Sequence, residues 1–252
     1  MLSNIIVSSW SDTNPATSLS SIDYASVLKL SFGGGEYERE GVARVDYRNY
    51  PFRQEKYGKA LIILGSCNGL ICLGVFKGSS CDLRKNHPIY IWNPSTKEYK
   101  EIPECKFSSN KFKVKYGFGY DNDIDDYKMV RISDGENHGC LDIQVYTLGS
   151  DSWHHVLTIS CSFSSDSTFF SVLFNGSLHW LGVTSSEVIF AFEICKERLV
   201  HLMLPEKTTE GWEEEDENAI KVVGVLGDCI CFSIWPGQYM GHAGLWRTKF
   251  MD

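Results

Sequence analysis

The sequence predicts an all-β fold built from repeated antiparallel hairpins, and three observations favour it. No long stretch places apolar residues at the i, i+3, i+4 and i+7 positions that an amphipathic helix requires. Short runs rich in β-branched and aromatic residues follow one another instead, and Gly, Asn, Asp and Ser separate them. The segment LDIQVY alternates, with Leu141, Ile143 and Val145 on one side of the expected strand.

Composition limits the classes of protein to which this chain can belong. Its 252 residues, 43% of them hydrophobic, suffice for one large all-β domain. A formal net charge of −8 argues against nucleic acid and against an anionic membrane surface as partners. No apolar run approaches the roughly 20 residues that cross a bilayer. Nine cysteines, an odd number scattered mostly in apolar runs, favour a reducing compartment, the cytoplasm or the nucleus.

A repeated outer hairpin gives the chain its period. In the segment IYIWNPSTKEYKEIP, residues 89–103, a large residue follows Trp92 after seven positions and an apolar residue after ten. The same spacing starts again from Tyr146 and from Phe192. Seven and ten positions after the aromatic residue come Tyr99 and Ile102 in the first copy, Trp153 and Val156 in the second, and Leu199 and Leu202 in the third. A strand, a tight polar turn and a returning strand explain this spacing.

A second, inner hairpin precedes each outer one. NGLICL (68–73), NGSLHW (175–180) and GDCICF (227–232) each begin with a turn dipeptide that tolerates positive φ, and 116–132 is a variant. Four strands in roughly 50 residues are typical of a kelch-type β-propeller blade. The sequence therefore predicts a β-propeller-like domain of about four repeated four-stranded units. Trp246 would be the aromatic of the last unit, which we expect to be incomplete at the C-terminus.

These segments, in this order, resemble the F-box-associated domain of plant F-box proteins, including S-locus F-box-like and F-box/kelch-repeat-like members. The matching segments are LGSCNGLICL, IYIWNPSTKEYKEIP, YGFGYDNDIDDYKMVRI, IQVYTLGSDSWHHV, FNGSLHWL and VIFAFEICKERLVHLMLP. The resemblance places a leader segment in residues 1–60, after a missing F-box and contributing the first strands. The interaction domain itself is expected in residues 61–252.

The resemblance implies a non-enzymatic function. In this family the domain recruits a target protein for ubiquitination by an SCF-type ligase, and other subunits carry out the transfer. A Skp-type adaptor and cullin would be partners only if an F-box lies upstream. Two alternatives stay open: a kelch/galactose-oxidase-like propeller enzyme or glycan binder, and a truncated scaffold without a specific partner.

The polar motifs do not predict a metal or cofactor site. Asp121, Asp123 and Asp125 have EF-hand spacing, but Asp126 stands where that loop needs Gly and Ile132 where it needs Glu. We interpret this segment as a solvated turn between two strands.

Cysteine and histidine pairs also have structural explanations. The cysteines at 67/72 and 229/231 lack the paired spacing of zinc sites and are interpreted as core residues. His154 and His155, adjacent on one strand, should point to opposite faces and cannot readily share a ligand.

Three connections between strands are the expected contacts with a partner, because binding residues concentrate on loops. They are residues 77–87, 133–139 and 206–217. Within them the candidate partner-binding residues are Arg84, His87, Glu136, His138 and Trp212. Trp212 stands out because it is a large aromatic within an acidic run, and aromatics anchor interfaces.

Metal analysis of the purified protein separates the receptor from the propeller enzyme. We expect no stoichiometric transition metal, because no cluster of ligands has the required spacing. Copper or zinc bound at one equivalent per chain after dialysis against a chelator would contradict the non-enzymatic reading.

Overall fold

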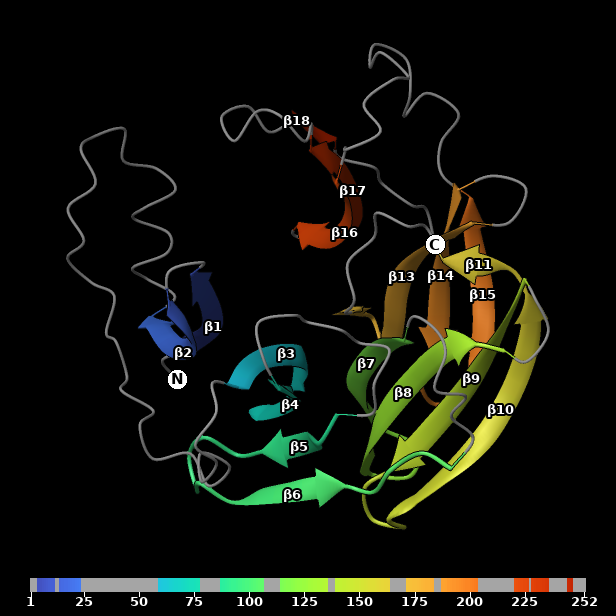
Figure 1. Ribbon diagram of the computed structural model, residues 1–252. Coiled ribbons are helices and arrows are strands. Elements are labelled where there is room, and N and C mark those ends of the chain that lie inside the picture. Colours follow the sequence, from blue (N-terminus) through green and yellow to red (C-terminus); the bar gives the residue numbers. More distant parts are fainter. Residues whose placement is uncertain are drawn as a thin grey trace.

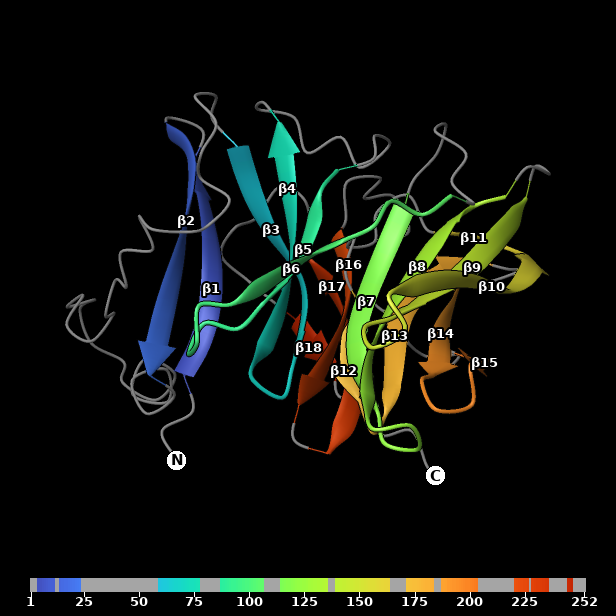
Figure 2. The same cartoon turned by 90° about the horizontal axis from the view of Figure 1, so that it is seen from below.

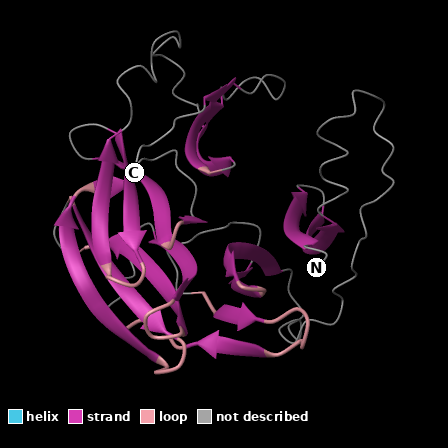
Figure 3. Cartoon of the chain, turned by 180° about the vertical axis from the view of Figure 1, so that it is seen from behind, coloured by secondary structure: helices cyan, strands magenta, loops and turns pink. Residues whose placement is uncertain are grey.

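The computed structural model describes residues 4–11, 14–23, 59–77, 87–106, 114–135, 139–163, 171–183, 187–203, 220–226, 228–235 and 244–246. These residues contain eighteen strands and no helix (Figure 1, Figure 3). The all-β prediction is confirmed. No helix in the described part of the chain has the length and apolar character of a membrane span.

The strands form five antiparallel sheets, and each sheet largely follows chain order. The first sheet holds β1 (Asn4–Ser11) and β2 (Asn14–Asp23). The second sheet holds β3 (Lys59–Cys67), β4 (Leu70–Lys77), β5 (Ile89–Trp92) and β6 (Tyr99–Ile102). The third sheet holds β7 (Val114–Asp121), β8 (Asp126–Asp134), β9 (Cys140–Thr147) and β10 (Ser152–Ser160).

The last two sheets depart from four strands. The fourth holds β11 (Ser162–Phe163), β12 (Val172–Phe174), β13 (Ser177–Val183), β14 (Glu187–Glu193) and β15 (Arg198–Met203). In the fifth, the described strands are β16 (Ile220–Leu226), β17 (Cys229–Trp235) and β18 (Gly244–Trp246). The short strands β11 and β12 pair with opposite ends of β13, so together they occupy the innermost position of the fourth sheet.

The sheets are arranged like the blades of a propeller. They fan around a common centre, with β3, β7 and β16 toward the centre and β6 and β10 toward the rim (Figure 1). Inner strands of neighbouring sheets touch: β3 lies against β7, β7 against β12, and β12 against β16. The predicted β-propeller fold is therefore confirmed.

The predicted outer hairpins have the expected register. Trp92 lies opposite Tyr99, Tyr146 opposite Trp153, and Phe192 opposite Leu199. Trp246 lies opposite Phe232 in the third strand of its sheet, which corresponds to the place of Trp92 in the second sheet. The seven-residue spacing read from the sequence is thus the register of a hairpin.

One turn geometry closes these hairpins. Lys97, Asp151 and Glu197 each follow the aromatic residue by five positions, and their φ angles are 65°, 51° and 48°. Asp125, five positions after Tyr120, has a φ of 56° and closes β7 onto β8 in the same manner. The inner hairpins use the tighter Asn-Gly turn, in which Asn68 and Gly69 both have positive φ.

The core consists of layers between sheets. Side chains of β8 alternate, so Met129 packs toward the second sheet while Val130 and Ile132 pack toward the fourth. The layer between the second and third sheets includes Leu64, Cys72, Ile91, Phe118, Met129 and Tyr146. The layer between the third and fourth includes Val130, Ile143, Val145, Trp180 and Phe190. A third layer joins Leu181 and Ile189 to Val223 and Ile230.

Close approach of the inner strands requires glycine in β7. A Cβ built on Gly117 would lie 2.6 Å from Ser171 Oγ and 2.7 Å from Trp180 Cζ2, both in the fourth sheet or its inner edge. The sequence Tyr-Gly-Phe-Gly therefore belongs to a strand.

An ion-pair network joins the third sheet to the fourth. Lys128 Nζ lies 2.7 Å from Asp121 Oδ2 and 2.6 Å from Glu197 Oε1, and the second Glu197 oxygen lies 2.7 Å from His154 Nε2. Burial opposes ionisation of Glu197, but hydrogen bonds from His154 and Lys128 outweigh it and lower the pKa of that carboxyl. Burial likewise opposes ionisation of Asp121, whose pKa is lowered by its hydrogen bonds, first of all from Lys128.

Substituting Gly117 tests the close approach of the two sheets. We expect Gly117→Ala to lower the free energy of unfolding by about 1–3 kcal/mol, because overpacking forces the facing side chains aside. Gly224→Ala in β16 is the matched control, since its Cβ would meet nothing within 4 Å. Urea denaturation of both variants measures the effect, and equal stabilities would contradict the packing argument.

Removing the ammonium of the network should be costly. Lys128→Met leaves Asp121, whose side chain is 1% exposed, without its counter-charge, so we expect a loss of about 3–5 kcal/mol in unfolding free energy. Lys196→Met is the control, because Lys196 is 68% exposed and a surface ion pair contributes about 0–1 kcal/mol. A loss for Lys128→Met no larger than the control would contradict the role given to the network.

The contribution of the Lys128 ion-pair network to the free energy of unfolding depends on pH. The pKa values of Asp121 and Glu197 are lowered in the folded protein, so their stabilisation is present above the ordinary values of 3.8 and 4.5. It is lost as the pH falls through the lower folded-state values. The difference in unfolding free energy between the native chain and Lys128→Met should therefore shrink in acid.

Candidate protein-recognition site

The order of strands separates two faces of the propeller. In the second, third and fourth sheets the antiparallel order places the short turns at one end of the strands: those from β3 to β4, β5 to β6, β7 to β8, β9 to β10, β12 to β13 and β14 to β15. Figure 2 shows two of them, between β7 and β8 and between β14 and β15, toward the lower side of the view. The longer connections begin and end at the opposite end of the strands, which we call the connection face.

The three connections expected to touch a partner lie largely outside the described residues, and the strands that flank them end on the connection face. Residues 77–87 join β4 to β5, residues 133–139 join β8 to β9, and residues 206–217 join β15 to β16. Each runs from a second strand to a third, or from one sheet to the next. Segments that are far apart in the sequence therefore start from the same side of the molecule.

Of the five predicted partner-binding residues, one falls within the described part of the chain. Arg84, Glu136, His138 and Trp212 lie outside the described residues. His87 directly precedes β5 and is half-buried. His87 is one of the residues that line a pocket.

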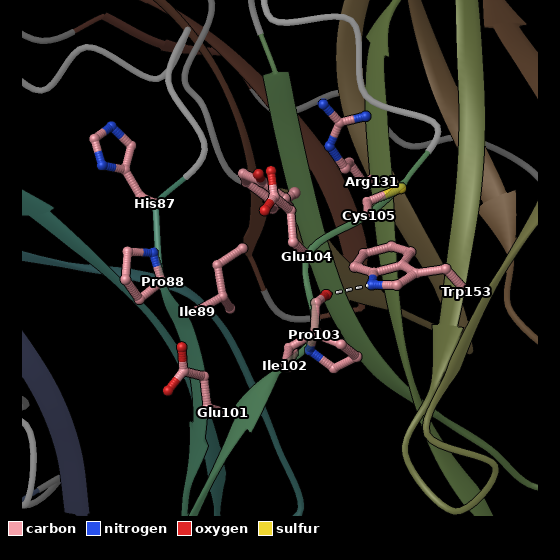
Figure 4. Close-up of a pocket in the computed structure, with 11 residues that line it drawn as sticks. His87, Pro88, Ile89, Glu101, Ile102, Pro103, Glu104, Cys105, Arg131 and Trp153 are labelled. Carbon is pink, nitrogen blue, oxygen red and sulfur yellow. Dashed lines mark hydrogen bonds between the residues drawn. The ribbon is translucent and has the colours of Figure 1, made fainter.

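The pocket lies where the second and third sheets meet, and we call it the seam pocket. Its volume is about 180 Å³. Figure 4 shows His87 and Trp153 on opposite sides of it. It is lined by His87, Pro88, Ile89, Glu101, Ile102, Pro103, Glu104, Cys105, Tyr116, Arg131 and Trp153. These residues come from β5, β6, β7, β8 and β10, together with the two residues before β5 and the connection that leaves β6.

Arg131 brings a buried positive charge to the seam pocket. The residue is 2% exposed, and its Nη1 donates to Ser133 Oγ at 2.9 Å and to Gln144 Oε1 at 3.1 Å. Tyr116 is also hydrogen-bonded to Arg131, and burial raises the pKa of the Tyr116 phenol, which therefore stays protonated. These neutral partners hold the guanidinium in a fixed orientation on the strand.

Trp153 fixes the opposite wall. Its indole Nε1 donates to the Pro103 carbonyl oxygen at 2.7 Å, which ties β10 of the third sheet to the segment leaving β6 of the second (Figure 4). Its ring lies 5.5 Å from that of Tyr146, centroid to centroid. The pocket is therefore preformed by contacts between the sheets.

The Asp-rich turn differs in one respect from its prediction. Residues 122–125 form an exposed turn as expected, but Asp121 is buried in the ion-pair network. Possible ligand atoms of Asp121, Asp123 and Cys195 lie within 4.8 Å of one another. The Lys128 ammonium, 2.7 Å from Asp121, already supplies a cation at this cluster.

Two of the four cysteines interpreted as core residues are buried, and two are not. All eight described cysteines are free; Cys72 and Cys231 are buried, whereas Cys67 and Cys229 are half-buried. Burial raises the pKa of the Cys72 thiol, and it raises that of Cys161 to about 12, so both are poor nucleophiles. His154 bonds Glu197 of the fourth sheet, whereas His155 contacts Thr158 on the other face of β10.

Arg131 and Tyr116 were missed as site residues by the sequence analysis. The available signal was a charged residue inside YKMVRI, a run otherwise typical of a buried strand. The pocket residues that come from the second sheet, such as Ile89 and Ile102, could not be predicted to meet Arg131, because that contact joins two separate sheets.

Comparison with known proteins agrees with this architecture. The family model of the F-box associated beta propeller domain matches residues 50–246. F-box protein CPR1 of Arabidopsis thaliana is 29% identical over 77% of this chain and 50% of its own length. F-box protein At3g07870 of the same plant is 25% identical over 74% of this chain and 47% of its own length.

F-box/kelch-repeat protein At3g23880 of A. thaliana is 27% identical over 57% of this chain and 38% of its own length. This chain thus spans half or less of the curated relatives that it matches. Among solved structures, TolB from Acinetobacter baumannii aligns over 99% of this chain and 54% of its own, with a TM-score of 0.46 and 11% identity, a likeness too low to add to the assignment. The match over most of the chain, in a fold of radial four-stranded sheets, shows that the chain belongs to the F-box associated beta propeller domain family.

Proposed function

We propose that this chain is the substrate-recognition domain of an SCF-type ubiquitin ligase and holds a target protein for ubiquitination. The observation that carries the proposal is the family match over residues 50–246, together with relatives that are F-box proteins. An F-box docks on a Skp-type adaptor and cullin assembly, so the propeller would supply the contact with the target. The ubiquitin transfer would belong to other subunits, and this chain would catalyse no step itself.

The architecture supports a binding function. Layers of side chains pack the sheets against one another, and the strand ends that lead into the longer connections share one face. Rigid scaffolds that present loops on one side are a common arrangement for recognition. The seam pocket opens among these elements and offers both apolar walls and a buried charge. Action in the cytoplasm or nucleus agrees with the free thiols of the eight described cysteines.

Affinity purification followed by mass spectrometry tests the proposal. The tagged gene product is recovered from its native tissue with the proteasome inhibited, so that bound targets persist. We expect at least one recovered protein to carry ubiquitin chains that depend on this gene, and to accumulate when the gene is silenced. An unrelated propeller with the same tag is the control. If no recovered protein changes in ubiquitination or abundance on silencing, the receptor function is wrong.

A further inference from the structure

Two inner hairpins of the propeller turn on the same dipeptide, Asn-Gly. The sequence contains this dipeptide twice, at residues 68–69 between β3 and β4 and at residues 175–176 between β12 and β13. All four residues are exposed and have positive φ, and a Cβ built on either glycine would meet nothing within 4 Å. The φ angles of the two asparagines, 47° and 46°, are nearly the same. The two turns therefore form a matched pair within one chain.

An asparagine that precedes a glycine can react with its own backbone. The glycine nitrogen attacks the side-chain carbonyl carbon of the asparagine, so a C–N bond forms, and the side-chain nitrogen leaves as ammonia with the proton of the glycine N–H. Water then opens the resulting succinimide ring at one of its two carbonyls, which yields aspartate or isoaspartate. Water is the only co-reactant. Glycine favours the attack because it has no Cβ to hinder close approach to its nitrogen.

The glycine nitrogens of both turns lie outside the strand ladders. The last ladder pairs are Cys67 with Leu70 and Phe174 with Ser177. Each Asn-Gly dipeptide is thus the two-residue loop beyond the last pair, as in other tight hairpins. Among the described residues, neither glycine nitrogen donates a backbone hydrogen bond outside the ladders. Reaction at this nitrogen therefore breaks no backbone hydrogen bond of the described structure.

The side chains of the two asparagines differ in their partners. Asn68 donates a hydrogen bond to the phenol oxygen of Tyr127 in the third sheet. The Asn175 side chain makes no hydrogen bond to another described residue. The bond of Asn68 must break before its carbonyl carbon can turn toward the glycine nitrogen, whereas Asn175 loses no such bond. The two sites should therefore differ in reactivity although their sequence and turn geometry agree.

From this comparison we infer that Asn175 is a site of spontaneous deamidation and that Tyr127 protects Asn68 from the same reaction. Isoaspartate at position 175 would add one carbon atom to the backbone of the turn. It would displace the Gly176 carbonyl oxygen, which accepts from the Ile194 N–H at 3.1 Å and so ties this turn to the one that follows β14. Ageing of the protein would thus loosen the fourth sheet at its turn end. The inference does not depend on the proposed function.

Peptide mass spectrometry of the aged native chain tests this inference. The full chain is kept in mildly alkaline buffer, digested at intervals and analysed for the mass increase that marks conversion of an amide to a carboxylate. We expect conversion at Asn175 to be about fivefold faster than at Asn68, the factor expected from one hydrogen bond that must break first. An isoaspartyl methyltransferase should label the peptide that contains position 175.

Tyr127→Phe is the matched variant, because it removes only the phenol oxygen that receives the Asn68 bond. Conversion at Asn68 should rise to the rate of Asn175 in this variant, while conversion at Asn175 stays unchanged. The chain unfolded in urea shows the rate of each site without the turn. Equal rates at the two sites of the native chain, or an Asn68 rate that Tyr127→Phe leaves unchanged, would overturn the protection. Conversion of Asn175 in the unfolded chain alone would overturn the site itself.

Discussion

Burial of both faces of the middle strands is the constraint on which the described core depends. The third sheet is covered by the second sheet on one side and by the fourth on the other, so alternate residues of one strand enter different core layers. Such a sheet cannot complete its core alone, and the radial arrangement covers both of its faces at once. The same constraint explains why the run VIFAF, residues 188–192 of β14, is buried at every position.

Two cations on β8 show how the constraint treats polar groups. Lys128 and Arg131, three positions apart, point to opposite core layers. Lys128 meets the carboxylates of Asp121 and Glu197, and this arrangement links two sheets. Arg131 donates to the neutral groups of Ser133 and Gln144, which orient its guanidinium within the third sheet. Both buried cations of this strand are thus held by hydrogen bonds, one toward each neighbouring sheet.

Features with a short sequence separation could be predicted, and features made by separate sheets could not. The seven-residue spacing from Trp92 to Tyr99 fixes the register of a hairpin, because both partners lie in one short segment. The pairing of two short strands, β11 and β12, with opposite ends of β13 could not be predicted in this way, because no short segment of sequence contains all three strands. The seam pocket likewise requires that Pro103 and Trp153 meet across two sheets.

The lining of the seam pocket belongs in part to the core of the fold. Arg131 lies on the strand that also supplies Met129 and Val130 to the layers on either side. Its guanidinium donates to Ser133 and Gln144 within the third sheet. Changing Arg131 would therefore perturb the junction of the second and third sheets, so a substitution at this position alters the stability of the fold as well as the lining of the pocket.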